Sequence, residues 1–151
     1  MYKQRQPLLD PAQEEVITSV VACGLTVHRE LGPGFKEAIY ERAVCLELDS
    51  RGIKFECQKP VEVRYKQWTI PGQRIDLIVD GVVLVEIKTV SKLKKLHESQ
   101  VVSYLKTTEL RVGLLMNFNS VLFQARPAAR RVVNGHRAHR FIVSIVKKSC
   151  P

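Results

Sequence analysis

The fold of this chain is best read from the segment VVLVEIKTV, residues 82–90. Its Val and Ile content is typical of a β-strand. Glu86 and Lys88 lie two residues apart within it, and because side chains alternate along a strand, both point to the same side of the sheet. Val83, Val85 and Ile87 form the opposite side. A strand otherwise suited to burial therefore carries a carboxylate and an ammonium group on one face.

RIDLIV, residues 74–79, is a second predicted strand, and Asp80-Gly81 joins the two as a hairpin. A two-residue loop would turn Asp76 away from Glu86. A connection with an odd residue count, such as a Gly bulge, puts Asp76 on the face of Glu86 and Lys88. The odd connection also unites the apolar residues of both strands on one face, so the hydrophobic pattern favours it. These apolar residues are Ile75, Leu77, Val79, Val83, Val85 and Ile87.

Two neighbouring carboxylates repel each other, so Asp76 and Glu86 need a cation if both are to be ionised. Oxygen ligands favour a hard divalent ion such as Mg²⁺ or Mn²⁺. Such an ion can activate a water and stabilise charge on a phosphodiester, and Lys88 could assist the water. The alternative is a salt bridge between Glu86 and Lys88, with Asp76 solvated.

The remaining pattern predicts an α+β fold, a mixed α/β arrangement with helices packed on a sheet. Helical spacing indicates helices over 12–31, 35–51 and 92–107, the first capped by Asp10-Pro11 and the second with an apolar stripe. That stripe comprises Phe35, Ile39, Ala43 and Leu46. Strands are predicted in 53–58, 61–66, 112–118, 121–123 and 130–133, and residues 68–72 as a turn or bend. Tyr65 and Trp68, which flank this turn, are candidates for base stacking, although packing is the commoner role of such residues.

The chain has 151 residues and a net charge of +9. Residues 124–151 hold seven of the 24 Lys and Arg residues and none of the 15 Asp and Glu residues, so most of the net charge lies there. This segment fits either contact with a phosphate backbone or a solvated tail. No apolar run is long enough to span a membrane and no signal-peptide pattern is present, which leads us to expect a cytoplasmic protein. Of the four cysteines, Cys23 and Cys45 are expected in the core.

The spacing D-x(9)-E-x-K resembles the PD-(D/E)xK nuclease superfamily, and several further blocks resemble one branch of it, the GxxExxY protein family. Residues 27–43 contain G-x-x-E-x-x-Y as Gly34, Glu37 and Tyr40. The helix after the E-x-K strand is similar to the family's helix at His97, Gln100 and Tyr104, and the segments GLLMNF (113–118) and RRVVN (130–134) are similar to its closing strand and C-terminal end. The resemblance covers residues 16–134.

This resemblance implies a restriction-endonuclease-like core, α-β-β-β-α-β, with a central mixed sheet flanked by helices. It implies hydrolysis of phosphodiester bonds by a metal-activated water. The expected catalytic residues are Glu37, Asp76, Glu86, Lys88 and Gln100. The expected ligands of Mg²⁺ or Mn²⁺ are Asp76, Glu86, Glu37 and the Ile87 carbonyl. No Pro stands beside Asp76, which departs from the family pattern.

The sequence predicts a nuclease-like domain over 1–134 and a basic extension over 135–151. Nucleic acid, DNA or RNA, is the expected partner, no membrane contact is expected, and a homo-oligomer is compatible with the sequence. The expected nucleic-acid contacts are Lys92, Lys94, Lys95, Arg130 and Arg131. The competing hypotheses are a nucleic-acid-binding module that does not cut and a protein-interaction subunit that retains the nuclease fold.

Overall fold

The computed structural model describes residues 9–119, 128–133 and 141–142. The elements run in the order α1-α2-β1-β2-β3-α3-β4-β5-β6. The helices are α1 (Pro11–Leu31), α2 (Glu37–Ser50) and α3 (Lys95–Thr108). The strands are β1 (Phe55–Tyr65), β2 (Trp68–Val79), β3 (Val83–Lys88), β4 (Val112–Asn117), β5 (Ala128–Val133) and β6 (Phe141–Ile142). The predicted α+β class is confirmed.

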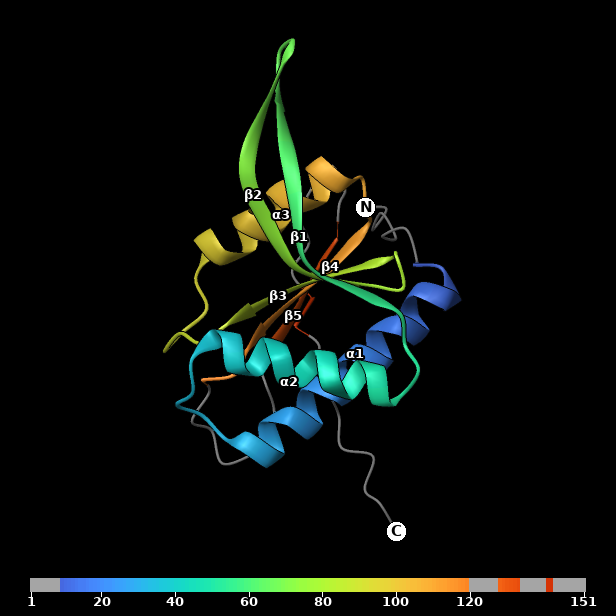
Figure 1. Ribbon diagram of the computed structural model, residues 1–151, viewed down its shortest axis with the longest axis vertical. Coiled ribbons are helices and arrows are strands. Elements are labelled where there is room, and N and C mark those ends of the chain that lie inside the picture. The colour runs from blue at the N-terminus through green and yellow to red at the C-terminus, as the bar shows by residue number, and fades with distance from the viewer. Residues whose placement is uncertain (1–8, 120–127, 134–140, 143–151) are drawn as a thin grey trace, which may run out of the picture.

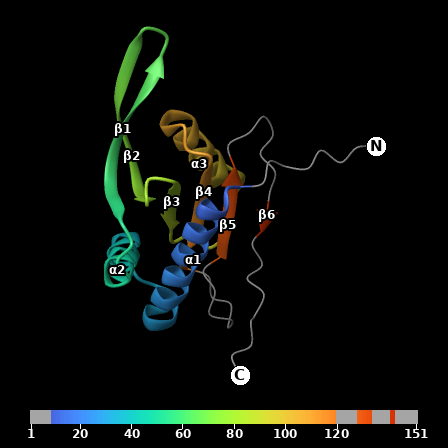
Figure 2. The same cartoon turned by 90° about the vertical axis from the view of Figure 1, so that its right-hand side faces the viewer.

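The strands form one mixed sheet in the order β1-β2-β3-β4-β5-β6. β3 and β4 are parallel, and the other neighbouring pairs are antiparallel. Parallel neighbours need a long crossover connection, and α3 supplies it between β3 and β4. Helices α1 and α2 lie on one face of the sheet and α3 on the other (Figures 1 and 2). The expected helix-flanked mixed sheet is therefore present.

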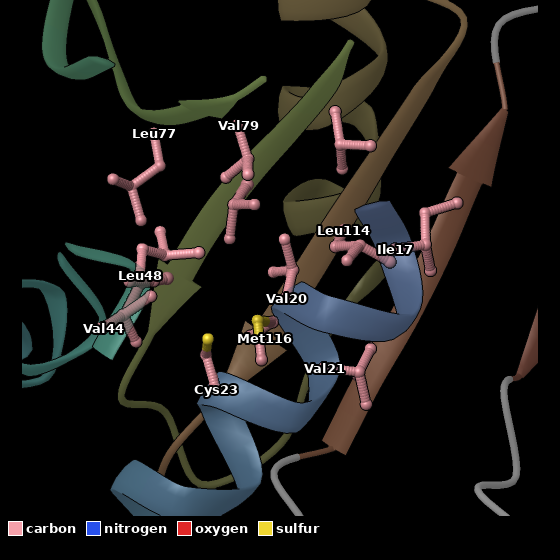
Figure 3. Close-up of a cluster of buried hydrophobic side chains, with 14 of the residues drawn as sticks. Ile17, Val20, Val21, Cys23, Val44, Leu48, Leu77, Val79, Leu114 and Met116 are labelled. Atoms are coloured by element: carbon pink, nitrogen blue, oxygen red, sulfur yellow. The ribbon is translucent and has the colours of Figure 1, made fainter. Parts of the chain in front are cut away.

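The larger core lies between the sheet and the pair α1 and α2 (Figure 3). Helix α1 begins as predicted, because the side chain of Asp10 accepts a hydrogen bond from the N–H of Ala12 and Pro11 occupies the first turn. Its contacts with the sheet are made by buried residues such as Val20 and Cys23, and α2 contributes others. The predicted core positions of Cys23 and Cys45 are confirmed.

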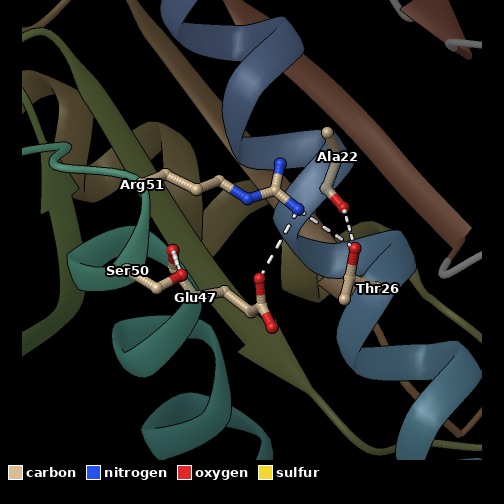
Figure 4. Close-up of polar contacts among 5 residues, drawn as sticks. All are labelled: Ala22, Thr26, Glu47, Ser50 and Arg51. Atoms are coloured by element: carbon tan, nitrogen blue, oxygen red, sulfur yellow. Dashed lines mark hydrogen bonds and ion pairs between the residues drawn. The ribbon is translucent and has the colours of Figure 1, made fainter.

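Arg51, at the end of α2, links the two helices of this layer (Figure 4). Its guanidinium donates a 3.1 Å hydrogen bond to the hydroxyl of Thr26 on α1 and lies 3.5 Å from the carboxylate of Glu47 on α2. The contact is partly exposed, so it orients the helices more than it stabilises them.

The second core lies under α3 and includes Val101, Tyr104 and Leu105. α3 comes close to the sheet at Gly113 of β4, where an added Cβ would lie within 2.6 Å of a methyl carbon of Val101. A larger residue at this position would force a neighbouring group to move, so the distance between helix and strand favours glycine.

The predicted odd hairpin connection is confirmed. Val79 pairs with Val83 and Leu77 with Val85, so a three-residue connection joins β2 to β3. Gly81 has a φ of +68°, as a bulged connection requires. One detail of the predicted apolar face is wrong, because Ile75 packs in the α3 core and not with Leu77 in the α1–α2 core. Ile75 and Leu77, the neighbours of Asp76 in the chain, therefore pack in the cores on opposite sides of the sheet.

The expected apolar stripe of α2 is also wrong. Phe35, Ile39 and Leu46 are about half exposed, at 47%, 47% and 53%. The buried residues of α2 are Tyr40, Val44, Cys45 and Leu48. Both stripes have helical spacing, and α2 packs against α1 and the sheet with the stripe that contains Tyr40.

β1 and β2 form a long hairpin that projects beyond the rest of the sheet and past α3 (Figures 1 and 2). The two segments predicted on either side of Pro60 are one strand, and Pro60 is tolerated because β1 is an edge strand. The turn expected at 68–72 is wrong: Tyr65 pairs directly with Trp68. Pro71 and Gly72 lie where the register shifts, so they form a bulge inside β2.

The described part of the chain contains no helix long and apolar enough to cross a membrane. β5 confirms the strand predicted at 130–133, whereas the one predicted at 121–123 lies outside the described residues. Most of the predicted extension 135–151 also lies outside them, and Phe141 and Ile142 pair with β5. The proposed domain boundary stays a prediction.

Candidate active site

Asp76, Glu86 and Lys88 come together where β2 and β3 stop pairing. The carboxylate of Asp76 accepts a 2.8 Å hydrogen bond from the N–H of Ile87. The ammonium group of Lys88 lies 3.1 Å from one carboxylate oxygen of Glu86. The side chain of Glu86 is only 4% exposed and that of Lys88 15%. The hairpin register thus brings the three predicted residues into one largely buried cluster.

Burial dominates the electrostatics of this cluster. Burial, and after it the charge of Asp76, raise the pKa of Glu86 to about 8, although Lys88 opposes the shift. Burial also raises the pKa of Asp76, against the hydrogen bond from Ile87 and the charge of Lys88. One ammonium group does not compensate a buried and a partly buried carboxylate, so the cluster carries more negative than positive charge when both carboxylates are ionised.

The second carboxylate oxygen of Glu86 is buried and has no hydrogen-bond partner by distance and angle, although a hydrogen bond with the Glu86 side chain lowers the pKa of the neighbouring Asp76. Leaving such an oxygen without a partner is costly once the carboxyl group is ionised. Together with the neighbouring Asp76, this oxygen fits the all-oxygen environment that Mg²⁺ or Mn²⁺ prefers. Among the described residues, however, no three His, Cys, Asp or Glu side chains are grouped closely enough to hold a metal ion. The residues therefore fit a divalent cation held by two carboxylates and completed by other oxygens.

Glu37 and Glu41 form a second acidic group beside the first, one helical turn apart in α2. Burial raises the pKa of both, and the charge of Asp76 adds to each shift. The charge of Lys88 lowers the pKa of Glu37. Glu37, expected as a metal ligand, lies within electrostatic reach of Lys88 and Asp76 but does not complete a three-residue metal group.

Glu41 and Gln58 are residues that the sequence reasoning missed. The Gln58 amide donates a hydrogen bond to the Glu41 carboxylate, and a hydrogen bond from Gln58 also lowers the pKa of Asp76. The i, i+4 spacing of Glu37 and Glu41 on one helix face could have revealed Glu41. Nothing local marks Gln58, whose backbone has a φ of +51° within a strand.

Tyr40 fixes the start of α2 and hence the position of Glu37. Its buried hydroxyl donates a hydrogen bond to the Gly32 carbonyl and accepts one of 3.2 Å from the N–H of Phe35. Its ring stacks on Phe118 at a centroid distance of 4.8 Å. Gly34 has a φ of +107°, which favours glycine. The G-x-x-E-x-x-Y segment is thus a turn, an acidic residue at the helix start, and a tyrosine that holds the turn.

An open pocket beside Lys88 is lined by α3 residues including His97 and Gln100. Gln100 donates a 2.9 Å hydrogen bond to the hydroxyl of Tyr104. His97 accepts a 2.9 Å hydrogen bond from the N–H of Lys94 and so caps α3. Gln100 and His97 thus both line the pocket beside Lys88, and His97 also caps α3.

The predicted nucleic-acid contacts fall into two groups. Lys92, Lys94 and Lys95 are exposed at the start of α3, near the pocket, although only Lys95 belongs to the helix. Arg130 lies 2.6 Å from Glu98 of α3, and Arg131 makes two 2.8 Å hydrogen bonds to Glu14 of α1. These ion pairs favour a structural role for the two arginines, which join β5 to the helices on both faces.

The model of the PD-(D/E)XK nuclease superfamily matches residues 14–132, which is most of the chain. The chain belongs to this superfamily. No curated protein and no solved structure matches it. Membership in the PD-(D/E)XK nuclease superfamily indicates a nuclease-type, hydrolytic function with nucleic acid as substrate, and nucleases of this superfamily generally use divalent metals. The D-x(9)-E-x-K residues of this PD-(D/E)XK domain are those that its hairpin brings together.

Proposed function

We propose that this protein is a nuclease of the GxxExxY branch that hydrolyses phosphodiester bonds with the help of Mg²⁺ or Mn²⁺. The observation that carries the proposal is the buried oxygen of Glu86, which lacks a hydrogen-bond partner beside a second carboxylate and an ammonium group. A purely structural salt bridge would leave neither an unsatisfied carboxylate oxygen nor a second, partly buried acid next to it.

Asp76 and Glu86 would hold the ion. The N–H of Ile87 points at Asp76, so its carbonyl, on the same edge of β3, is a suitable additional oxygen. A bound divalent cation supplies charge stabilisation for the phosphate and a water of lowered pKa. Lys88 carries its positive charge at the mouth of the pocket, where it orients the attacking water or stabilises the developing negative charge.

The surrounding residues have positioning roles. The Gln100 amide, fixed by Tyr104, presents its remaining hydrogen-bonding atoms to the pocket. Glu37 and Glu41 enlarge the negative field around Asp76 and thereby favour binding of a cation. Support for the GxxExxY branch comes from the role of its three motif residues, because Gly34 and Tyr40 set the turn from which Glu37 is placed.

A nuclease assay on single- and double-stranded DNA and RNA, with Mg²⁺, Mn²⁺ or a chelator, tests the proposal. We expect metal-dependent cleavage that Asp76→Asn and Lys88→Ala reduce by at least about 100-fold, the scale of losing one electrostatic stabiliser. Asp80→Asn is the matched control, because Asp80 is an exposed carboxylate on the same hairpin, outside the cluster. Nucleic-acid binding without cleavage by a folded wild-type protein would instead support the non-catalytic binding module.

A further inference from the structure

The β1–β2 hairpin presents aromatic rings far from any core. At its tip, Tyr65 and Trp68 are each 54% exposed, and Ile70 is 50% exposed. The rings of Tyr65 and Trp68 are stacked, with centroids 6.3 Å apart and planes inclined by 20°. Exposed aromatic groups of this size on a projecting element are typical of binding surfaces.

Positive charge accompanies these rings. The ammonium group of Lys66 lies 5.4 Å from the centroid of the Tyr65 ring, and Arg64 precedes it on β1. Glu62 is the one acidic residue between positions 61 and 73. Aromatic faces combined with Lys and Arg match the requirements of unpaired nucleotides, which stack their bases and carry a negative backbone.

The hairpin also leads directly into the candidate active site. β2 carries Trp68 near its start and Asp76 near its end. The eight steps from Trp68 to Asp76 span at most roughly 26 Å at about 3.3 Å per residue. A strand stacked as in duplex DNA advances about 3.4 Å per nucleotide, so such a strand in contact with both positions would extend over roughly eight nucleotides, and an unstacked strand over fewer.

We propose that the β1–β2 hairpin is a binding arm for unpaired nucleotides, which stack on Trp68 and Tyr65 while the same strand reaches the Asp76–Glu86–Lys88 cluster. This inference rests on the proposed action on nucleic acid and adds where the substrate is held. A simpler role exists for the aromatic pair, since cross-strand rings stabilise a hairpin by themselves. That role predicts no change at Trp68 when nucleic acid is added.

Trp68 is the only tryptophan of the chain, so intrinsic fluorescence reports on this position alone. In the test, the full chain carrying Lys88→Ala is titrated with oligo(dT) or oligo(U) in the presence of a chelator. The oligonucleotides have about 16 nucleotides, which is the upper end of common single-strand site sizes. We expect saturable quenching that weakens with added salt. Blunt duplex of the same length should quench less, because its bases are already stacked.

The contribution of Trp68 to oligonucleotide affinity is measured with a labelled oligonucleotide, whose binding is followed by fluorescence anisotropy. Trp68→Ala should weaken binding by about 5-fold or more, the lower limit for loss of one stacked base. Trp68→Phe should retain most of the affinity. Thr69→Ala is the matched control, because Thr69 is also exposed on the same arm but lies on the opposite face of β2 from Trp68; the affinity of this variant should be unchanged.

Unchanged fluorescence at saturating oligonucleotide, or equal affinity of Trp68→Ala and wild type, would overturn the arm proposal. A fluorescence change caused by protein concentration alone would also overturn it, because it would assign the arm to contact with a second copy. Cleavage by wild type without quenching would reject only the arm, whereas quenching without cleavage would reject only the nuclease.

Discussion

Glu86 shows how a single residue can favour ligand binding at the expense of folding stability. It is part of a strand that is buried on both faces, and its partner Lys88 reaches only one of its two oxygens. Burial therefore favours the protonated form. A divalent cation would compete with that proton, so the same environment that disfavours the free carboxylate increases the benefit of binding a cation.

The first prediction concerns stability and pH. The pKa of Glu86 rises from 4.5 to about 8 on folding, so the folded state holds a proton that the unfolded state has lost between these values. The stability contributed by this group is complete below pH 4.5 and declines as the pH rises toward 8. The free energy of unfolding, measured with urea in the presence of a chelator, should therefore decline less between pH 5 and pH 8 in Glu86→Gln than in wild type. This pH window is set by the pKa shift of Glu86.

Asp80→Asn provides the control, because its exposed carboxylate should leave the pH profile unchanged. Parallel profiles for Glu86→Gln and wild type would contradict the assignment of the raised pKa to Glu86.

The second prediction concerns metal affinity. Because cation binding must displace the proton from Glu86, Mn²⁺ affinity measured by calorimetry should rise by up to about tenfold per pH unit below pH 8 and level off above it. Buffers of different ionisation enthalpy should reveal about one released proton per bound ion near pH 7. Affinity independent of pH would exclude Glu86 as a ligand.

At the scale of elements, two close contacts determine where the helices lie. Tyr40 holds the turn before α2, and Gly113 lets α3 approach β4. Each contact positions an element that carries site residues, Glu37 and Glu41 on α2 and Gln100 on α3. We therefore expect substitutions at these two buried positions to affect both stability and activity.

The third prediction concerns Tyr40→Phe, which removes a hydroxyl bonded to the Gly32 carbonyl and the Phe35 N–H. The free energy of unfolding should fall by about 1–3 kcal/mol, because the Tyr40 hydroxyl is buried and its backbone partners lose their bonds. Tyr104→Phe is the control: its hydroxyl bonds only a half-buried side chain, so its loss should be smaller. Equal losses for Tyr40→Phe and Tyr104→Phe in urea unfolding would argue against a special role of the Tyr40 hydroxyl in holding the turn before α2.

The fourth prediction concerns Gly113→Ala. The added methyl group would meet Val101 at 2.6 Å, so α3 must move away from the sheet. The free energy of unfolding should fall by about 1–3 kcal/mol, the usual cost of overpacking. Adding Val101→Ala should recover part of this loss, and a double-mutant cycle in urea would measure the coupling. Additive losses of stability in the two single variants would mean that the side chains at positions 113 and 101 do not clash.

At the scale of the whole molecule, the site depends on elements that are distant in sequence. α2, β2, β3 and α3 each contribute, and ion pairs of Arg130 and Arg131 connect β5 to helices on both sides of the sheet. A ligand that binds only this assembled site must stabilise the whole folded state.

The fifth prediction follows from that linkage. At pH 8, Mn²⁺ or Mg²⁺ at 100 times its Kd should stabilise the protein by about 2.7 kcal/mol and raise the Tm by several degrees. Asp76→Asn should abolish most of the shift in a thermal scan, whereas Asp80→Asn should retain it. A shift of equal size in both variants would place the ion elsewhere.

Much of the site could be read from local sequence. The alternation in β2 and β3 fixed which residues share a face, and the hydrophobic pattern selected the three-residue connection that the structure contains. Asp76, Glu86 and Lys88 were found in this way, because strand periodicity is a local property. The first helix, with Asp10 and Pro11 at its start, was predictable for the same reason.

Three features required the tertiary structure. α2 has two stripes with helical spacing, and only its packing against α1 shows that the stripe with Tyr40 is buried. Gln58 enters the site from a strand that pairs with β2, a contact between distant residues. The arm at Trp68 appeared as a turn because Pro71 and Gly72 usually mark one, whereas here they form a bulge.

Period and register within one short segment are enough to show which side chains can cooperate on the central hairpin. Their depth of burial, the acids around them and the position of the aromatic arm became visible in the folded structure alone. Those properties arise from packing and pairing between segments far apart in the chain, and burial in turn sets the charge state of Glu86.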